Sequence, residues 1–166
     1  LFQNPDSPFR ELLFTERNSD YKGSHYPRRA VRDQRFKLIE TLLIDRDNPL
    51  ATLYLTDTVN AIAKGGPKKW EIAESPVFKL YNEWRRPPRI QLYDLQKDPY
   101  ELTDLSDVPA YTTVKYNLLA KLKTWQKETD DPLRFPEKLK ELTYEHDTIK
   151  TSRAKSDWLY PKYLYQ

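Results

Sequence analysis

The chain of 166 residues contains no cysteine, no methionine and only two histidines, His25 and His146. Without cysteine it can form no disulfide, no thiolate nucleophile and no zinc site built on thiolates. Two histidines would need carboxylates to complete a zinc site. We therefore expect this chain to bind no metal and no cofactor. No Ser, His and carboxylate form a recognisable catalytic set, so we assign the chain no catalytic residue.

Long apolar runs are also missing, since no stretch approaches the roughly 20 residues that a helix needs to span a membrane. The charge is almost balanced, with 28 Lys and Arg against 25 Asp and Glu. So small a net charge does not by itself indicate nucleic acid, but it is compatible with a polyanionic ligand. We expect neither a membrane nor a nucleic acid as a partner.

Apolar alternation and turn-forming residues predict four short strands. The expected strands lie near residues 11–16, 29–33, 36–41 and 90–94. The second and third are separated by a short polar connection, which predicts a β-hairpin. Two prolines, Pro87 and Pro88, favour extended chain before the fourth strand.

The clearest helical pattern runs from Tyr111 to Glu128. Its apolar stripe consists of Val114, Leu118, Leu122 and Trp125. This spacing predicts an amphipathic helix packed across the sheet. Shorter helices are expected after Thr56 or Asp57 and from Pro136 towards Tyr144. The predicted fold is therefore α+β, a four-stranded, mainly antiparallel sheet with one long helix across it, an irregular or helical insert and a C-terminal tail.

Three segments, residues 9–16, 29–39 and 92–105, carry a family resemblance. The last is the most specific and reads Leu-Tyr-Asp-Leu-Gln-Lys-Asp-Pro-Tyr-Glu-Leu-Thr-Asp-Leu. Together the segments resemble the opening strand, the hairpin and the strand-and-turn signature of the C-terminal domain of the sulfatase family. Tyr26-Pro27-Arg28 before the hairpin and the long insert are similar to the sulfamidase subgroup, which acts on N-sulfoglucosamine of heparan or heparin.

The resemblance implies a hydrolase that removes sulfate groups from sulfated saccharides. In this family a formylglycine, made from Cys or Ser in a Cys/Ser-x-Pro-x-Arg motif, attacks sulfur beside a calcium ion that acts as a Lewis acid. Residues 6–10, Asp-Ser-Pro-Phe-Arg, miss that motif because Asp stands at the nucleophile position. We expect Ca²⁺ and formylglycine to come from an N-terminal domain outside this chain, and the chain alone to be inactive.

The resemblance also implies the organisation and location of the protein. Residues 1–132 are expected to form the sulfatase C-terminal domain with an insert at 43–88, and residues 133–166 to add a helix and an aromatic extension to it. The expected partners are the N-terminal sulfatase domain and a sulfated saccharide. We expect export to a periplasm, the cell exterior or a lysosome-like organelle, where such polymers are degraded.

The loop between the first two strands is the candidate substrate-binding site. It carries Glu16, Arg17, Asn18, His25, Tyr26 and Arg28. Arg side chains can hold sulfate or uronate through paired, charge-assisted hydrogen bonds. In the family the corresponding loop faces the substrate pocket. The alternative is a polar surface loop whose exit is fixed by Tyr26 and Pro27.

Three further groups have both a functional and a structural interpretation. Asp45, Asp47 and Asn48 offer oxygen ligands of the kind calcium takes, but the remaining ligands are missing and a solvated turn is preferred. Asp94, Asp98 and Glu101 are interpreted as turn and cap residues. The aromatic residues of the insert can stack on sugars, but a large insert needs its own core, which is the preferred interpretation. These aromatic residues are Trp70, Phe78, Tyr81 and Trp84.

Two basic clusters support an alternative function, a polyanion-binding module for nucleic acid or heparin without catalysis. The clusters are Arg28, Arg29, Arg32 and Arg35, and Arg85, Arg86 and Arg89. Binding through such clusters would fall steeply with salt. Against this alternative, alternation along a strand sends neighbouring side chains to opposite faces, so a continuous basic stripe is not assured.

Overall fold

The computed structural model describes residues 11–18, 25–53 and 76–151. Its four strands form one antiparallel sheet in the order β1-β2-β3-β4. The strands are β1 (Leu13–Arg17), β2 (Arg28–Arg32), β3 (Phe36–Thr41) and β4 (Ile90–Asp94). Their bounds lie within two residues of the predicted ones, and the α+β class is confirmed.

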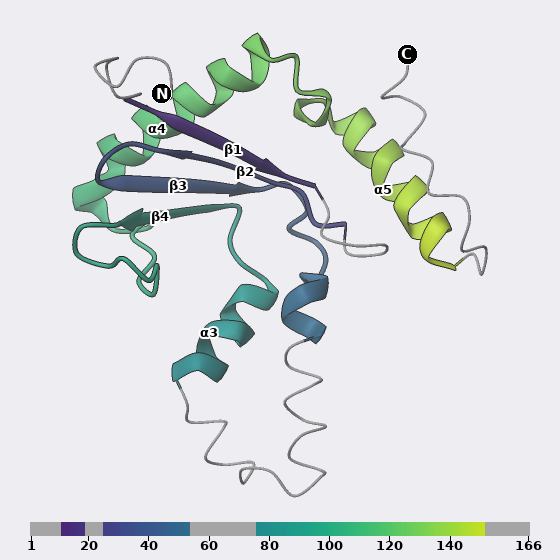
Figure 1. Cartoon of the computed structure of the whole chain (residues 1–166), viewed down its shortest axis with the longest axis horizontal. Helices are drawn as coiled ribbons and strands as arrows, with labels where there is room; N and C mark the ends of the chain where they lie inside the picture. The colour runs from purple at the N-terminus through teal and green to yellow at the C-terminus, as the bar shows by residue number, and fades with distance from the viewer. Residues whose placement is uncertain (1–10, 19–24, 54–75, 152–166) are drawn as a thin grey trace, which may run out of the picture.

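A helix covers one face of the sheet, and other helices flank its end (Figure 1). The helices are α3 (Pro76–Arg85), α4 (Thr112–Glu128) and α5 (Pro136–Thr151), with 3-10 turns η1 (Pro109–Tyr111) and η2 (Pro132–Arg134). A short helical segment also occupies 49–53. In Figure 1, α4 crosses the sheet, while α5 lies beyond the carboxyl end of β1.

The main core lies between the sheet and α4, as the apolar stripe predicted. Strand register aligns Val31, Leu38 and Leu92 in one row across the sheet. These three side chains are fully buried against Leu118 and Leu122 of α4. Burying one such side chain contributes roughly 1.5–3 kcal/mol, so this row supplies much of the stability of the layer.

A buried ion pair joins the same face of the sheet to the end of α4. Arg29 on β2 donates from Nε and Nη2 to the two carboxylate oxygens of Asp131, at 2.7 and 2.9 Å. The two side chains are 1% and 2% exposed. Arg29 lies on the α4 face because it stands two residues before Val31, and alternate residues of a strand share a face.

The opposite face of the sheet is not covered by α4. Its residues alternate with those of the core, and the register places Arg17 beside Arg28 and Lys37 beside Tyr93. Ile39 lies in the row between these pairs. This face is therefore polar at both ends and apolar in the middle, and we call it the open face.

Two helices differ from expectation. Sequence analysis did not predict α3, whose aromatic side chains were interpreted as a core of the insert in preference to a surface that stacks on sugars. α5 continues to Thr151, beyond the expected end near Tyr144. It is held by a second small core of Leu42, Leu133 and Leu142, which local sequence patterns do not reveal. The helix expected after Thr56 or Asp57 lies outside the described residues.

The turn around Asn48 also differs from a solvated loop. Asn48 is fully buried, and its backbone N–H donates to the carbonyl of Arg85 at 2.8 Å. Its side chain accepts from the backbone N–H of Leu50 and donates to the carbonyl of Trp84. Asn48 therefore ties the chain after β3 to the end of α3.

We predict that Asp131→Asn lowers the free energy of unfolding by about 3 kcal/mol, because it leaves the buried charge of Arg29 without its carboxylate. Chemical denaturation of the purified protein measures this change. The matched control is Asp130→Asn one residue earlier, where the side chain is exposed and pairs with Arg134. Equal denaturation midpoints for the two variants would contradict a stabilising role for the buried pair.

Candidate functional site

The described ends of the predicted loop meet on the open face. Arg17, the last residue of β1, is the register partner of Arg28, the first residue of β2. Side chains of directly opposed residues have Cβ atoms about 4.5–5.5 Å apart, and like charges so placed repel one another. Two guanidinium groups so placed can donate charge-assisted hydrogen bonds to one anion. Residues 19–24 of the loop lie outside the described residues.

The guanidinium of Arg28 is held between two aromatic rings. Its central carbon lies 5.3 Å from the centroid of the Tyr26 ring and 5.5 Å from that of Trp84 on α3. Burial raises the pKa of Tyr26, so its hydroxyl stays protonated at neutral pH. Cation–π contacts on two sides restrict the rotamers of Arg28 and orient its planar donors.

Glu16 and Asn18 lie at the other face of the strands, around Arg29. Asn18 accepts from Nη1 of Arg29 at 2.9 Å, and Glu16 approaches Nη2 at 3.7 Å. Since Asp131 already holds this guanidinium, the buried ion pair fixes the position where the predicted loop leaves β1.

His25 points towards α5 instead of the open face. Its side chain is buried and its ring stacks on that of His146, with centroids 4.4 Å apart. Nε2 lies 3.3 Å from the hydroxyl of Thr143. Burial, with His146 and Arg46 nearby, lowers the pKa of His25 from 6.5 to about 4. His25 is therefore neutral at pH 7 and packs the loop against α5.

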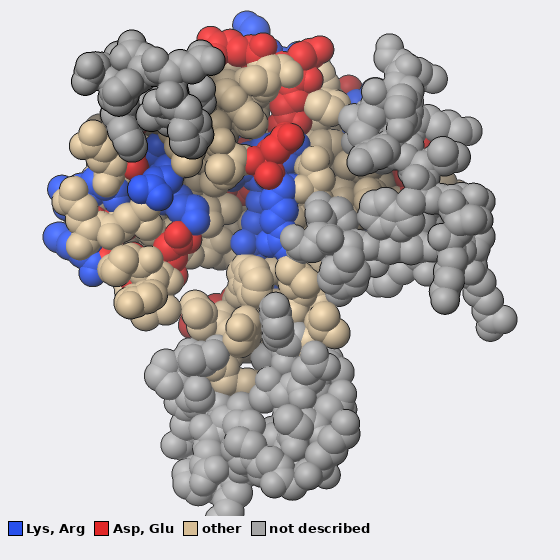
Figure 2. Space-filling view, in the orientation of Figure 1, with Lys and Arg blue, Asp and Glu red and all other residues tan. Residues whose placement is uncertain are grey.

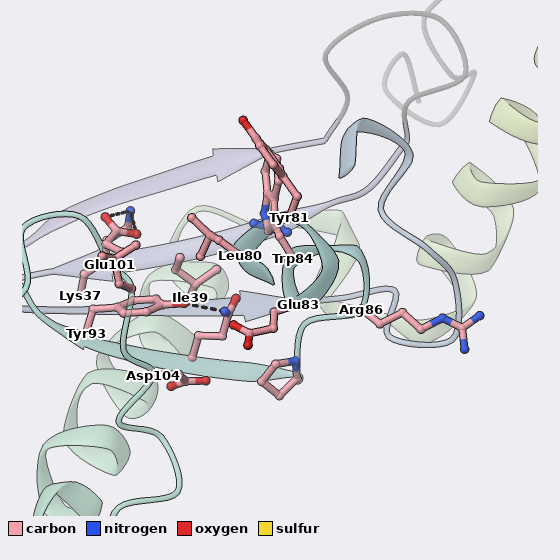
Figure 3. A pocket seen from close by; sticks show the side chains of 14 residues that line it. Lys37, Ile39, Leu80, Tyr81, Glu83, Trp84, Arg86, Tyr93, Glu101 and Asp104 are labelled. Carbon is pink, nitrogen blue, oxygen red and sulfur yellow. Dashed lines mark hydrogen bonds and ion pairs between the residues drawn. The ribbon is translucent and has the colours of Figure 1, made fainter. Parts of the chain in front are cut away.

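A groove of about 610 Å³ continues from Arg28 across the open face. Its walls come from β3, β4, α3 and the turn after β4 (Figure 3). Lining residues include Lys37, Ile39, Tyr81, Trp84, Tyr93 and Glu101. The groove thus combines aromatic and polar side chains that are far apart in the sequence.

Sequence analysis missed most of this groove. Trp84 and Tyr81 were noted as aromatic residues, but nothing local indicated that α3 returns to the open face. Lys37 and Tyr93 lie opposite each other on neighbouring strands. The only signal in the sequence for their place on the open face was that each alternates with core residues along its strand. Asp94, Asp98 and Glu101 make structural contacts with Arg35, the backbone N–H of Thr103 and Lys37 respectively.

The basic clusters do not form one continuous cationic surface. Arg29 is buried with Asp131, Arg35 pairs with Asp94, and Arg86 pairs with Asp47. The Arg35 guanidinium holds the pKa of Asp94 below its usual range. Figure 2 shows Lys and Arg interleaved with Asp and Glu over the sheet region on the face it displays.

Two curated proteins match most of this chain. No family model matches it. The N-sulphoglucosamine sulphohydrolase of Homo sapiens is 29% identical over 131 residues, which cover 75% of this chain and 24% of that protein. An ulvan-active sulfatase of Formosa agariphila is 30% identical over 135 residues, 80% of this chain and 24% of that protein. The chain belongs to the sulfatase family.

The two sulfatase matches support the assignment of this chain as a C-terminal sulfatase domain. The chain spans about a quarter of the length of these relatives. A solved structure of a 2-O GAG sulfatase is 18% identical, with a TM-score of 0.48, over 80% of this chain and 19% of that one. The family assignment depends on the two sequence relatives.

Sulfatases generally depend on Ca²⁺ and formylglycine, and the described residues do not fit either group. Within residues 11–18, 25–53 and 76–151, no three or more His, Cys, Asp or Glu side chains are grouped to hold a metal ion. The chain has no Cys, and the Asp-Ser-Pro-Phe-Arg segment lies outside the described part. We derive no catalytic step on this chain. None of the described helices is long and apolar enough to span a membrane.

The pKa of His25 predicts how stability depends on pH. The folded pKa, about 4, lies below the unfolded value of 6.5, so the unfolded chain binds the proton first as the pH falls. The stabilisation is complete above pH 6.5 and is lost between pH 6.5 and 4. We expect the free energy of unfolding to fall by about 2 kcal/mol from pH 7.5 to 5, as measured by urea denaturation.

The control for this pH prediction is His25→Phe, which keeps an aromatic ring against His146 but cannot titrate. Burial also lowers the pKa of His146, and Asp147 opposes both shifts, so the variant should retain a smaller slope in the same direction. An unchanged slope in His25→Phe would show that another group carries the pH dependence.

Proposed function

We propose that this chain is the C-terminal domain of a sulfatase that acts on sulfated saccharides, and that it shapes the substrate pocket. The observation that carries the proposal is the opposed pair Arg17 and Arg28, within a chain whose relatives are sulfatases. The name of the human relative favours N-sulfoglucosamine as the sulfated unit, and the proposed polymer is heparan or heparin.

Within this proposal, the two arginines bind an anionic group and orient the sugar. A guanidinium presents donors in a plane that matches the oxygens of sulfate, sulfamate or carboxylate. Tyr26 and Trp84 hold Arg28 from two sides, so little side-chain freedom is lost when the anion binds. The other predicted residues act indirectly in this proposal. Asn18 and His25 anchor the two ends of the loop, and Glu16 lies beside Arg29.

The chemical step belongs to another part of the longer protein in this proposal. An N-terminal sulfatase domain would supply formylglycine and Ca²⁺ and would be the main partner of this chain. Export to a periplasm, the cell exterior or a lysosome-like organelle follows from the extracellular origin of sulfated polysaccharides. The division at residues 132 and 133, and the insert at 43–88, remain predictions.

Arg17→Ala and Arg28→Lys in the full-length protein test the anion site. A hydrogen bond to a charged group is worth about 1.5–3 kcal/mol, so each change should lower kcat/KM for a sulfated saccharide about tenfold or more. Arg28→Lys keeps the charge but loses the planar fork. Arg32→Ala on the same face is the matched control and should keep wild-type turnover. Wild-type turnover in all variants would remove this pair from the site.

The isolated 166-residue chain should hydrolyse no sulfate ester or sulfamate, because its sequence contains no Cys/Ser-x-Pro-x-Arg motif for the formylglycine nucleophile of the family. Assay of the purified chain with N-sulfated and O-sulfated disaccharides measures this directly. Sulfatase activity that co-purifies with the chain through chromatography would overturn the proposed division of labour.

A further inference from the structure

The groove beside Arg28 has the dimensions and walls of a ligand site. Its volume of about 610 Å³ lies within the roughly 300–1,000 Å³ of small-molecule pockets. Trp84 and Tyr81 line it from α3, and their ring centroids lie 6.0 Å apart at 41°. Tyr93 lines it from β4, with Ile39 beside it, so the floor and one wall are largely aromatic and apolar (Figure 3).

The charges around this groove are matched. Lys37 donates to both carboxylate oxygens of Glu101, at 2.7 and 2.9 Å. Arg86 turns away from the other lining side chains and pairs with Asp47 (Figure 3). The carboxylates of Glu83 and Asp104 also line the groove. Lys37 and Arg86 are therefore already paired and add no binding position for a sulfate group.

Hydrogen-bonding groups converge on the same space. Gln91 donates from Nε2 to the Tyr93 hydroxyl at 2.6 Å. Burial, together with Asp104 and Glu101, raises the pKa of Tyr93, so this hydroxyl keeps its proton and can donate. Asp104 accepts from the backbone N–H of Leu92 and of Ser106, which fixes its carboxylate at the rim.

An unsulfated sugar ring matches this combination. A pyranose has a C–H face that packs on an aromatic ring, and hydroxyl groups that need donors and carboxylate acceptors. A sulfated ring would instead place an anion beside Glu83 and Asp104, which repel it. Arg28 lines the groove and is also the register partner of Arg17, so the two surfaces are continuous.

We propose that the groove between α3 and the open face binds an unsulfated ring of the same saccharide whose sulfated unit lies at Arg17 and Arg28. This inference rests on the proposed function. It adds a determinant of specificity. Trp84, Tyr81 and Glu83 recognise the neighbouring sugar, while the arginine pair binds the anion. The insert that carries α3 is thus part of the saccharide site.

Two matched disaccharides of glucosamine joined to glucose, one N-sulfated and one N-acetylated, test the inference in the full-length protein, because neither carries a carboxylate. Trp84→Ala should raise the Kd of the N-acetylated probe about tenfold by calorimetry. It should also lower kcat/KM for the N-sulfated probe by a similar factor. Arg17→Ala should lower kcat/KM for the N-sulfated probe and leave the Kd of the N-acetylated probe unchanged.

Two further variants guard against a folding effect of Trp84→Ala. Glu83→Gln preserves the shape of the side chain at an exposed position and should weaken binding of the N-acetylated probe severalfold. Tyr116→Ala removes an exposed aromatic ring from α4, across the sheet, and should change the binding of neither probe. Circular dichroism at the assay temperature checks that each variant is folded.

The outcomes separate the two proposals. If Trp84→Ala weakens binding of the N-acetylated probe but the protein does not desulfate the N-sulfated probe, the groove proposal is supported and the proposed function is wrong. If the N-acetylated probe does not bind, or binds equally to wild type, Trp84→Ala and Glu83→Gln, the groove proposal is overturned. The groove proposal would also be overturned if another part of the full-length protein, without ligand, already covered residues 80–84 and protected them from hydrogen exchange.

Discussion

The buried ion pair between Arg29 and Asp131 is the constraint on which the described architecture depends. A guanidinium on the core face of a central strand is tolerated only if a carboxylate meets it with good geometry. Asp131 reaches it because α4 ends at Glu128 and the chain turns immediately. The same guanidinium also holds Asn18, so the helix position, the sheet and the start of the candidate loop depend on one contact.

Strand alternation then divides the sheet into two surfaces with different tasks. Val31, Leu38 and Leu92 pack one face of the sheet against α4 and supply hydrophobic free energy of folding. Their neighbours in each strand are left on the open face, where Arg28 and Tyr93 have no role in that core. A single four-stranded layer can therefore stabilise the fold on one side and leave the other side for recognition.

The sequence alone was sufficient to predict the elements of the fold that depend on local periodicity. The four strands and α4 follow from alternation and from the spacing of Val114, Leu118 and Leu122, which is why their bounds were predicted closely. The end of α5 and the path of α3 depend on contacts across long stretches of chain, such as Leu42 with Leu142 and Asn48 with Trp84. His25 was identified as a candidate from its residue type, but only tertiary packing reveals that its ring is buried against His146.

The arrangement around Arg28 explains why the insert and the sheet must act together. A guanidinium on an open strand end samples many rotamers, and ordering it on binding costs free energy. Trp84, brought by α3, and Tyr26, next to β2, restrict Arg28 before any ligand arrives. A lysine has no planar face to be held in this way. In the proposed site, the insert therefore orients Arg28 for the anion and also lines the groove, although it contains neither member of the arginine pair.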